Sequence, residues 1–379
     1  MSSGSPAGGA VMQVMHQGGG AGSVTSALHL SIGLMRAGWP IRFVCPPDSE
    51  VESLAAAAGL EPIALRLPPN SRARNAAALA ELLRRVPVAL VNSQSARDRA
   101  ALTWLALTRR LPVPFIATRR QMPRTFPLEN WLTSRLAARI IAVSRPVASA
   151  LVRRGTPRSK VVVVPNGLVT ERVDVPVAPA AVESWRERIG WRPDQRTIGI
   201  VSRRKDQEVV LRALEWVAPP VRLVLAGVAP AELEPLIRRV PERHAVVAIP
   251  FAGDIRALYE LLELLLLPSR MEGLSQAALE AMALGKPVAL SAAGGNLDLV
   301  RHGADGLLVA PTEPRAWAAA IERLLGDAPL RDRLGGAARR TARVRFALEH
   351  TVRLTARVYE EVLRCPPGAA GAHFRVAGN

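Results

Sequence analysis

The sequence has only two cysteines, Cys45 and Cys365, and they lie far apart in a chain of 379 residues. Two distant cysteines provide neither a disulfide framework nor the paired ligands of a zinc site. Aromatic residues are also scarce, at 4% of the chain, whereas hydrophobic residues make up 49%. We therefore expect cores built from Ala, Leu and Val, and we expect no metal site.

Long apolar runs are missing as well. The run Leu264–Leu267 is too short to cross a membrane and is typical of a buried parallel strand. Residues 1–10, MSSGSPAGGA, lack the basic and apolar segments of a secretion signal, so we expect a flexible tail. Residues 366–379 are rich in Gly and Ala and predict a second flexible tail. Together these absences favour a cytoplasmic protein.

Charge is abundant but one-sided. The net charge is +18, and most of the excess lies in residues 1–190. This asymmetry favours a polyanionic partner for the first half, such as an anionic membrane surface or a phosphorylated acceptor. An Arg-rich, Lys-poor composition can also reflect genome composition alone. No zinc-finger, RNA-recognition or basic-zipper pattern is present, so nucleic acid is a disfavoured partner.

Apolar runs of Val, Ile and Leu alternate with amphipathic stretches of Ala, Leu and Arg along the chain. This alternation is typical of α/β units with parallel sheets, and the length fits two domains. The segment Val173–Ala181, rich in Pro, Val and Ala, is the best candidate for the boundary between them.

One stretch, Pro268–Gly295, carries the strongest local pattern. After the strand Leu264–Leu267, a loop leads to a helix for which Ser275 is a plausible N-cap. Gly285 is placed to end that helix, and a second strand, Val288–Leu290, follows. The sequence therefore predicts strand, loop, helix and strand in succession.

Two carboxylates, Glu272 in the loop and Glu280 in the helix, are separated by seven residues. The start of a helix offers free N–H groups that suit phosphate, and carboxylates accept hydrogen bonds from sugar hydroxyls. The combination suits a nucleotide sugar. For either glutamate alone, a surface acid near a helix start is the plainer interpretation.

The segment PSRMEGLSQAALEAMALGKPV resembles the Glu-x7-Glu signature of retaining glycosyltransferases of glycosyltransferase family 4. The resemblance implies a GT-B fold, in which two Rossmann-like domains with parallel sheets face a central cleft. It implies an acceptor-binding domain at 11–175, a nucleotide-sugar-binding domain at 176–345 and a helix at 346–365 that crosses back to the first domain.

The same resemblance implies roles for individual residues. Glu272 would lie near the donor sugar and diphosphate, and Glu280 would bind the ribose. The backbone amides of Gly273, Leu274 and Ser275 would face the diphosphate.

Three adjacent basic residues follow the predicted strand Thr197–Val201. Family members place an Arg and a Lys in this loop to neutralise the donor diphosphate, usually several residues apart. Here we favour Arg204 and Lys205, with Arg203 as a substitute, because two cations stabilise a leaving group that gains negative charge. The alternative is a solvated basic run.

In the first half, the glycine loop after the strand Val11–Met15 resembles the family loop that faces the donor phosphates. Gly22 and Ser23 occupy the end of that loop, where glycine lets a ligand approach the backbone. His16 lies where the strand enters the cleft, which makes it an acceptor-binding candidate, although an isolated His is more often structural.

Gln94 stands where related enzymes often have a His that contacts the transferred sugar. Its amide can hydrogen-bond a sugar but cannot act as a base, so this departure bears on donor or acceptor identity. Asp98 is a nearby carboxylate that could bind the acceptor or cap the next helix.

A predicted loop after the strand Phe115–Ala117 holds Arg119, Arg120 and Arg124. Arginines at the carboxyl end of a parallel strand are typical of an anion site, here for the acceptor, and a solvated basic loop is the alternative. The helix Arg97–Arg110 places Trp104 among arginines, which suits either a membrane surface or core packing.

We therefore expect a retaining glycosyltransferase that moves a sugar from a nucleotide-diphosphate sugar to a glycan or lipid-linked acceptor. Bacterial cell-envelope polysaccharide or lipopolysaccharide synthesis would be its setting, at the inner face of the cytoplasmic membrane. No cofactor is expected besides the nucleotide-sugar co-substrate, and no metal is needed if cations and helix amides neutralise the diphosphate. The alternatives are a nucleotide-sugar 2-epimerase of the same fold and a non-catalytic nucleotide-sugar-binding subunit.

Overall fold

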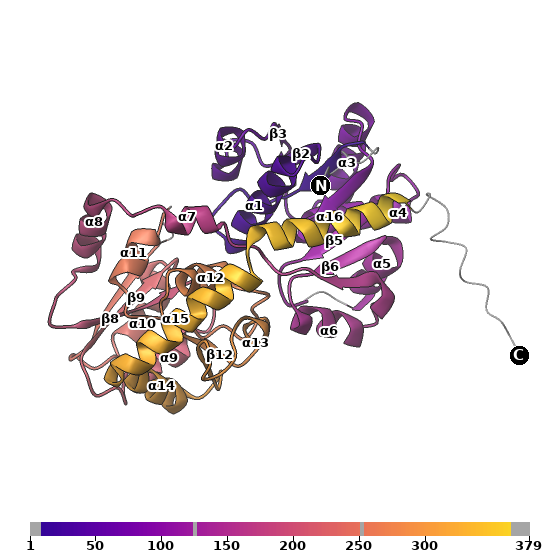
Figure 1. The fold of residues 1–379 in the computed structure, drawn as a ribbon. Helices are drawn as coiled ribbons and strands as arrows, with labels where there is room; N and C mark the ends of the chain where they lie inside the picture. The colour runs from indigo at the N-terminus through magenta and orange to yellow at the C-terminus, as the bar shows by residue number, and fades with distance from the viewer. Residues whose placement is uncertain (1–8, 124–126, 251–253, 365–379) are drawn as a thin grey trace, which may run out of the picture. The chain divides into compact units, whose positions relative to one another are not determined.

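The computed structural model describes residues 9–123, 127–250 and 254–364 (Figure 1). The predicted tail at 366–379, residues 1–8 of the other predicted tail, and Arg124 lie outside these ranges. The chain forms two compact units. Of the described residues, unit 1 comprises 9–19, Ser23–Gly167 and Leu348–Arg364, and unit 2 comprises Gly20–Gly22 and Leu168–Ala347.

Unit 1 contains a seven-stranded parallel sheet in the order β3-β2-β1-β4-β5-β6-β7. The strands are β1 (Val11–Val14), β2 (Ile41–Cys45), β3 (Pro62–Ala64), β4 (Leu90–Ser93), β5 (Phe115–Arg119), β6 (Arg139–Ala142) and β7 (Val161–Val163). The order reverses between β1 and β4, and ligands of such sheets bind where the carboxyl ends of two such strands diverge.

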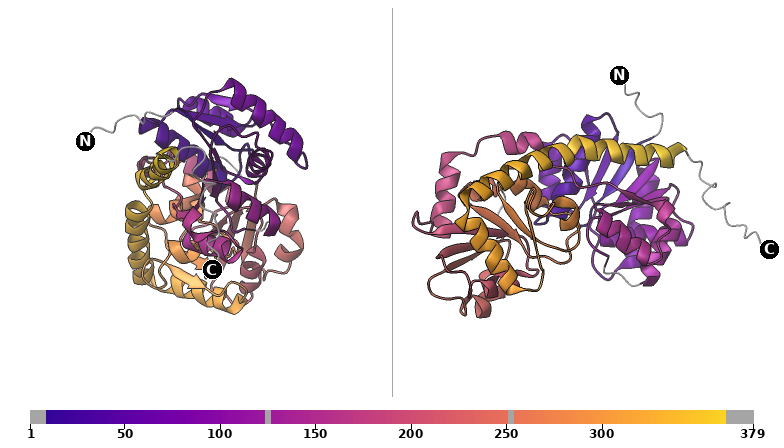
Figure 2. Two further views of the ribbon diagram at one scale, coloured as in Figure 1. Left: turned by 90° about the vertical axis from the view of Figure 1, so that its right-hand side faces the viewer. Right: turned by 60° about the horizontal axis from the view of Figure 1, so that its bottom comes forward.

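The helices of unit 1 lie on both faces of this sheet (Figure 2). They are α1 (Gly22–Arg36), α2 (Glu50–Ala57), α3 (Arg72–Arg85), α4 (Ala96–Leu107), α5 (Pro127–Leu136), α6 (Arg145–Arg153), the 3₁₀ turn Arg158–Lys160, and α16 (Leu348–Arg364). The last of these packs directly on α1, because a Cβ on Gly33 would lie 2.6 Å from Val352. Its Tyr359 is buried, with its ring edge-on to Trp39.

Unit 2 contains a six-stranded parallel sheet in the order β10-β9-β8-β11-β12-β13. The strands are β8 (Arg196–Val201), β9 (Val221–Ala226), β10 (Ala245–Ile249), β11 (Leu264–Leu267), β12 (Val288–Ser291) and β13 (Leu307–Val309). The helices are α7 (Thr170–Asp174), α8 (Pro179–Ile189), α9 (Gln207–Ala213), α10 (Pro230–Ile237), α11 (Arg256–Leu261), α12 (Gln276–Ala283), α13 (Asn296–Leu299), α14 (Pro314–Gly326) and α15 (Ala328–Arg345). Here the order reverses between β8 and β11.

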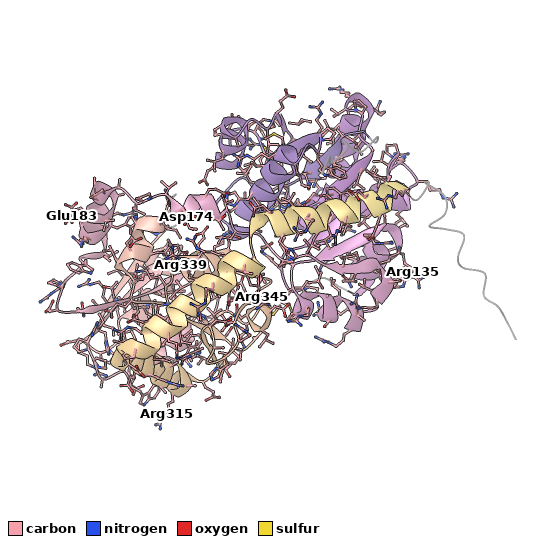
Figure 3. All side chains as sticks on the ribbon, in the orientation of Figure 1. Arg135, Asp174, Glu183, Arg315, Arg339 and Arg345 are labelled. Atoms are coloured by element: carbon pink, nitrogen blue, oxygen red, sulfur yellow. The ribbon has the colours of Figure 1, made fainter. Side chains whose placement is uncertain are left out.

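The units divide at Gly167 and Leu168, before the predicted boundary at 175. The reason is α7, whose Asp174 forms an ion pair with Arg343 of α15 at 2.6 Å, within unit 2. The Arg343 hydrogen bond lowers the pKa of Asp174, and Arg339 on the same helix adds to the effect. Asp174 and Arg339 are labelled in Figure 3. The segment that looks like a linker in the sequence is therefore held to unit 2 by an ion pair from α7.

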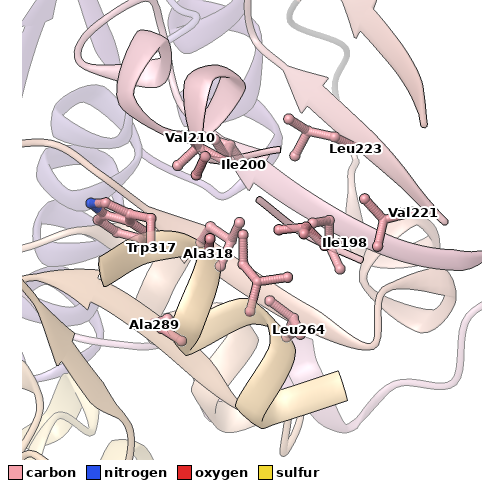
Figure 4. Packing of buried hydrophobic residues seen from close by; sticks show 14 of the residues in the cluster. Ile198, Ile200, Val210, Val221, Leu223, Leu264, Ala289, Trp317 and Ala318 are labelled. Atoms are coloured by element: carbon pink, nitrogen blue, oxygen red, sulfur yellow. The ribbon is translucent and has the colours of Figure 1, made fainter. Parts of the chain in front are cut away.

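The core of unit 2 is aliphatic, as the scarcity of aromatic residues predicts. Ile198, Leu223 and Leu264 from the sheet pack with Ala289 and with the fully buried Trp317 of α14 (Figure 4). Burying each large aliphatic side chain contributes about 1.5–3 kcal/mol before conformational entropy is subtracted.

Most of the predicted central segment is confirmed. Leu264–Leu267 is a strand, and the Ser275 side chain accepts the N–H of Ala278 at 3.3 Å at the start of α12. Gly285 follows the helix with a φ of +78°, a conformation that favours glycine. Across residues 9–123, 127–250 and 254–364, no helix has both the length and the apolar character needed to cross a membrane.

Candidate active site

Two loops meet at the switch point of unit 2. One follows β8 and the other follows β11, and the carboxyl ends of these adjacent strands lie at the same edge of the sheet. The Lys205 ammonium forms an ion pair with the Glu272 carboxylate. The Arg270 guanidinium forms a second ion pair with Asp206, with Nη2 2.8 Å from Oδ1. Two ion pairs thus join the two loops.

The three adjacent basic residues do not act as a group. Lys205 reaches Glu272, whereas Arg204 pairs with Glu208 of α9 at 3.2 Å. Arg203 is exposed, and its Nε donates to the carbonyl of Gly20 at 2.7 Å. The local fold therefore sends neighbouring side chains to three different partners.

Gln207 holds the basic loop in place, and the sequence analysis missed it. Its buried side chain donates from Nε2 to Ser202 Oγ at 3.0 Å and to the Arg203 carbonyl at 2.8 Å. Its Oε1 accepts the N–H of Lys205 at 2.5 Å. No local signal in the sequence distinguishes this glutamine from a surface residue at a helix start.

The loop from Glu272 to Ser275 rests on a pair of glycines. The N–H of Gly295 donates to the Glu272 carbonyl at 2.9 Å, and a Cβ on Gly295 would lie 1.6 Å from the Gly273 oxygen. Gly294 has a φ of +54° and also contacts the Glu272 backbone closely. Leu274 and Ser275 are buried, so the loop backbone is fixed before α12 begins.

The predicted glycine-loop residues belong to different units. Gly22 is part of unit 2, where a Cβ on it would lie 3.2 Å from that of Gln276 on α12. Ser23 belongs to unit 1, and its hydroxyl donates to Gln17 Oε1 at 3.2 Å.

Glu280 lies on α12 and is partly buried. Burial raises its pKa to about 6, Asp254 adds to the rise, and Arg172, Arg256 and the Tyr259 hydroxyl oppose it. The carboxylate is therefore ionised at neutral pH and can accept hydrogen bonds from hydroxyl groups.

In unit 1, His16, Ser95 and Asp98 form a cluster at the carboxyl ends of β1 and β4. The fully buried Asp98 carboxylate accepts the N–H of Gln94 at 2.7 Å and that of Ser95 at 2.9 Å, so it caps α4. It also lies 3.1 Å from His16 Nδ1, and the Ser95 hydroxyl contacts both groups. Asp98 therefore serves as a helix cap and holds the histidine ring. The sequence analysis missed Ser95.

A second polar network lies beside this cluster. Gln94 Oε1 accepts from Arg120 Nε at 3.1 Å and Nη2 at 2.8 Å, and Arg120 Nη1 donates to Asn166 Oδ1 at 2.7 Å. Gln94 Nε2 donates to Gln13 Oε1 at 2.5 Å, and Gln13 Nε2 donates to the Tyr359 hydroxyl at 2.7 Å. Gln94 is buried, and both ends of its amide are engaged inside the protein.

The predicted start of the arginine-bearing loop is wrong. Strand β5 continues through Arg119, so this residue lies on the sheet rather than in a loop. Both Arg119 and Arg120 are buried, and burial lowers their pKa values to about 9 and about 10. Both side chains therefore remain charged at neutral pH. Within the described ranges, no group of three or more His, Cys, Asp and Glu side chains is arranged to hold a metal ion.

Two family models match this chain. The model for glycosyl transferases group 1 matches residues 182–341, and the model for glycosyltransferase family 4 matches residues 20–172. These segments cover most of both units. The chain therefore belongs to the glycosyltransferases that the two models describe, and its two parallel-sheet units have the GT-B fold.

The chain is also similar in sequence to individual glycosyltransferases. It is 28% identical over 240 residues to an uncharacterized glycosyltransferase of Methanocaldococcus jannaschii, covering 61% of this chain and 62% of the relative. It is 33% identical over 242 residues to a D-inositol 3-phosphate glycosyltransferase of Xylanimonas cellulosilytica, covering 60% of this chain and 58% of the relative. The matches thus span about three fifths of these relatives.

Among solved structures, the Anabaena protein HepE in complex with UDP and glucose has a similar fold. Its TM-score is 0.81 at 19% identity, covering 93% of this chain and all of that one. At this identity the likeness concerns the fold alone.

Proposed function

We propose that the protein is a retaining glycosyltransferase that moves a sugar from a nucleotide-diphosphate sugar to a glycan or lipid-linked acceptor. The observation that carries the proposal is the ion pair of Lys205 and Glu272 at the switch point of unit 2. It places a cation and a carboxylate beside the backbone loop that leads into α12.

In this proposal unit 2 binds the donor. The Glu280 carboxylate accepts a ribose hydroxyl, and the amides of Gly273, Leu274 and Ser275 face the diphosphate. The diphosphate competes with Glu272 for the Lys205 ammonium, which leaves Glu272 to accept hydrogen bonds from the sugar. Arg204 is a weaker candidate than Lys205 for contacting the diphosphate, because it is paired with Glu208. Arg203 and Gly22, which also belong to unit 2, complete the proposed donor site.

The chemical step moves one glycosyl group. The bond between the sugar C1 and the phosphate oxygen breaks, and the acceptor oxygen forms the new bond to C1 on the same face. The acceptor proton passes to the leaving phosphate, so no side-chain base is required. Lys205 stabilises the negative charge that grows on the nucleoside diphosphate. The proposal involves no metal or cofactor.

Unit 1 would bind the acceptor through His16, Gln94, Asp98, Arg119 and Arg120. These residues lie near the carboxyl ends of β1, β4 and β5, where ligands of parallel sheets bind. We assign the acceptor to envelope polysaccharide or lipopolysaccharide synthesis at the inner face of the cytoplasmic membrane.

A surface on α4 and α5, which we call the α4–α5 patch, supports a membrane contact. It consists of Trp104, Leu107, Leu128 and Trp131, which are 40%, 46%, 66% and 45% exposed. Three of them line a shallow apolar hollow with Arg72 and Leu132. Exposed apolar side chains near arginines suit the headgroup region of an anionic bilayer.

The test is a thermal-shift and calorimetric titration with UDP, GDP and ADP and their sugar conjugates. We expect one nucleotide to bind preferentially and Glu280→Ala to lose that binding, whereas Glu260→Ala, an exposed glutamate on α11, retains it. Failure of every nucleotide to bind would overturn the donor site. With the donor known, retention is read from the anomeric configuration of the product by NMR. Interconversion of nucleotide sugars without transfer would instead indicate an epimerase, and neither transfer nor donor hydrolysis would indicate a binding subunit.

A further inference from the structure

Arg120 carries a buried positive charge that no described carboxylate of unit 1 neutralises. It is 9% exposed and follows β5, next to the point where the order of the sheet reverses. Its three hydrogen bonds go to the amide oxygens of Gln94 and Asn166, which are neutral. Among the described residues no carboxylate forms an ion pair with it. A buried charge without a counter-ion is costly to maintain, so this arrangement calls for an explanation.

Another arginine of the same region is treated differently. Arg99 on α4 is also buried, and the carboxylate of Glu129 lies 3.7 Å from its Nη2. The fold therefore places a counter-charge beside Arg99. Around Arg120 it places amides, which orient a guanidinium without cancelling its charge.

The amide network fixes the direction of Arg120. A guanidinium only donates hydrogen bonds, so Gln94 must turn its oxygen toward it. The Gln94 nitrogen then faces the oxygen of Gln13, and the Gln13 nitrogen faces the Tyr359 hydroxyl. Each amide has one permitted orientation, and the arginine is held from one side by a preorganised frame.

The N–H groups of Arg120 can be counted against their hydrogen-bond acceptors. A guanidinium has five N–H groups, and Arg120 uses one on each of Nε, Nη1 and Nη2 in its bonds with the described residues. Among residues 9–123, 127–250 and 254–364, no acceptor takes the remaining N–H on each Nη nitrogen. Two such donors match the two oxygens of a carboxylate or a phosphate.

We propose that Arg120 receives an oxyanion of the acceptor, a phosphate or a carboxylate, and so restricts acceptors to anionic ones. The inference rests on the proposed function and narrows its acceptor class.

The test uses the full chain saturated with UDP, so that the donor site is filled. Inorganic phosphate and glucuronate are titrated separately by calorimetry, which distinguishes a phosphate receptor from a carboxylate receptor. The variants are Arg120→Gln, which removes the charge, and Gln94→Glu, which places a carboxylate against the guanidinium. Arg36→Gln, an exposed arginine of α1, is the matched control for adventitious binding.

We expect the protein to bind at least one of the two probes, with a dissociation constant raised about tenfold to a hundredfold in Arg120→Gln and Gln94→Glu. Arg36→Gln should bind as the unaltered protein does, and UDP affinity should be unchanged in all variants. Gln94→Glu keeps a hydrogen-bonding side chain in the network, so it carries the test if Arg120→Gln fails to fold. Equal binding in Gln94→Glu, absence of binding by the unaltered protein, or loss of UDP affinity in the Arg120 variant would each overturn the proposal. If UDP does not bind, GDP or ADP takes its place, whichever binds. Failure of all three nucleotides would count against the donor site in unit 2, not against Arg120.

Discussion

Lys205 and Glu272 form an ion pair that links the loop after β8 to the loop after β11 within unit 2. Each side chain can exchange its partner for a ligand group of the opposite kind: the ammonium for a phosphate oxygen, the carboxylate for a sugar hydroxyl. In the proposed function, the neighbouring pair of Arg270 and Asp206 would keep the two loops joined during this exchange.

Lys205→Ala should lower the turnover number by on the order of a hundredfold, because a cation beside the leaving diphosphate acts mainly on the transition state. Steady-state transfer kinetics with the identified donor measure this. Arg204→Ala is the matched control and should change turnover much less, since Arg204 is paired with Glu208. Equal losses in the two variants would mean that Arg204 leaves Glu208 to contact the diphosphate.

Glu280 should make nucleotide binding depend on pH. Its folded-state pKa is about 6, above the ordinary 4.5, so the carboxylate that we propose as the acceptor of a ribose hydroxyl is lost as the pH falls through about 6. We expect nucleotide affinity to drop by up to about tenfold per pH unit below that value. Calorimetry between pH 5 and 8 measures the drop, and Glu280→Gln should remove the pH dependence.

The raised pKa of Glu280 also makes the stability of the fold depend on pH, and here the protonated form is the favourable one. A raised carboxyl pKa contributes stability that is complete below the unfolded value of 4.5 and is lost as the pH rises through about 6. Glu280→Gln should therefore be more stable than the unaltered protein at pH 7.5, by about 1–2 kcal/mol, and the difference should vanish near pH 4. A lower stability of the variant at pH 7.5 would contradict the assignment of burial as the cause.

Gly295→Ala should destabilise unit 2 by more than about 2 kcal/mol, because the new methyl group would overlap the Gly273 carbonyl. Chemical denaturation measures the loss, and weaker nucleotide binding should accompany it. Gly326→Ala at the end of α14 is the control, since a Cβ there meets no atom within 4 Å. Similar effects of both changes would show that the loop contact is not responsible.

Tyr359→Phe should destabilise unit 1 by about 1–3 kcal/mol, because the amides of Gln13 and Asn92 both donate to this hydroxyl at 2.7 Å. Thermal unfolding measures the change. Tyr259→Phe in unit 2 removes the bond to the Ala277 carbonyl at 3.1 Å and the hydroxyl's hydrogen bond to Glu280. It should cost less, because it leaves no buried amide N–H without its acceptor. An equal or larger cost for Tyr259→Phe would contradict the importance of the Tyr359 hydroxyl as a double acceptor.

Replacing Trp104 and Leu128 of the α4–α5 patch together by Ser should weaken binding to phosphatidylglycerol vesicles. Both side chains are well exposed, and arginines on the same unit add an attraction that salt should screen. Vesicle sedimentation at low and high salt measures both effects. Trp216→Ser changes an exposed tryptophan of unit 2 and should leave binding unchanged. No binding to anionic vesicles at low salt would exclude this membrane contact.

The local elements of the sequence were predictable where a short pattern decides them. The strand Leu264–Leu267, the cap at Ser275 and the glycine at 285 all depend on neighbours within a few positions. The C-terminal end of β5 was not predictable in this way, because pairing with β6 extends the strand through Arg119 despite its charge.

The site partners were harder to predict because they come from distant parts of the chain. Gln207 and Arg270 look like ordinary polar residues until the sheet brings their loops together. Tyr359 lies hundreds of positions from Gln13, and no periodicity links them. What the sequence did indicate correctly was the family, since the model for glycosyl transferases group 1 matches residues 182–341, which include the segment Pro268–Gly295.

The position of α16 has a consequence for how the protein is made. Unit 1 starts with β1, yet the hydroxyl that accepts hydrogen bonds from β1 and β4 belongs to α16, which the ribosome delivers only after residues 168–347. Unit 2 can thus complete its fold during translation, while the sheet of unit 1 waits with the buried amides of Gln13 and Asn92 lacking this acceptor. Domains usually fold in order from the N-terminus. Here the order of synthesis allows the second unit to finish first, and we expect the nascent first unit to be the part that needs protection from aggregation.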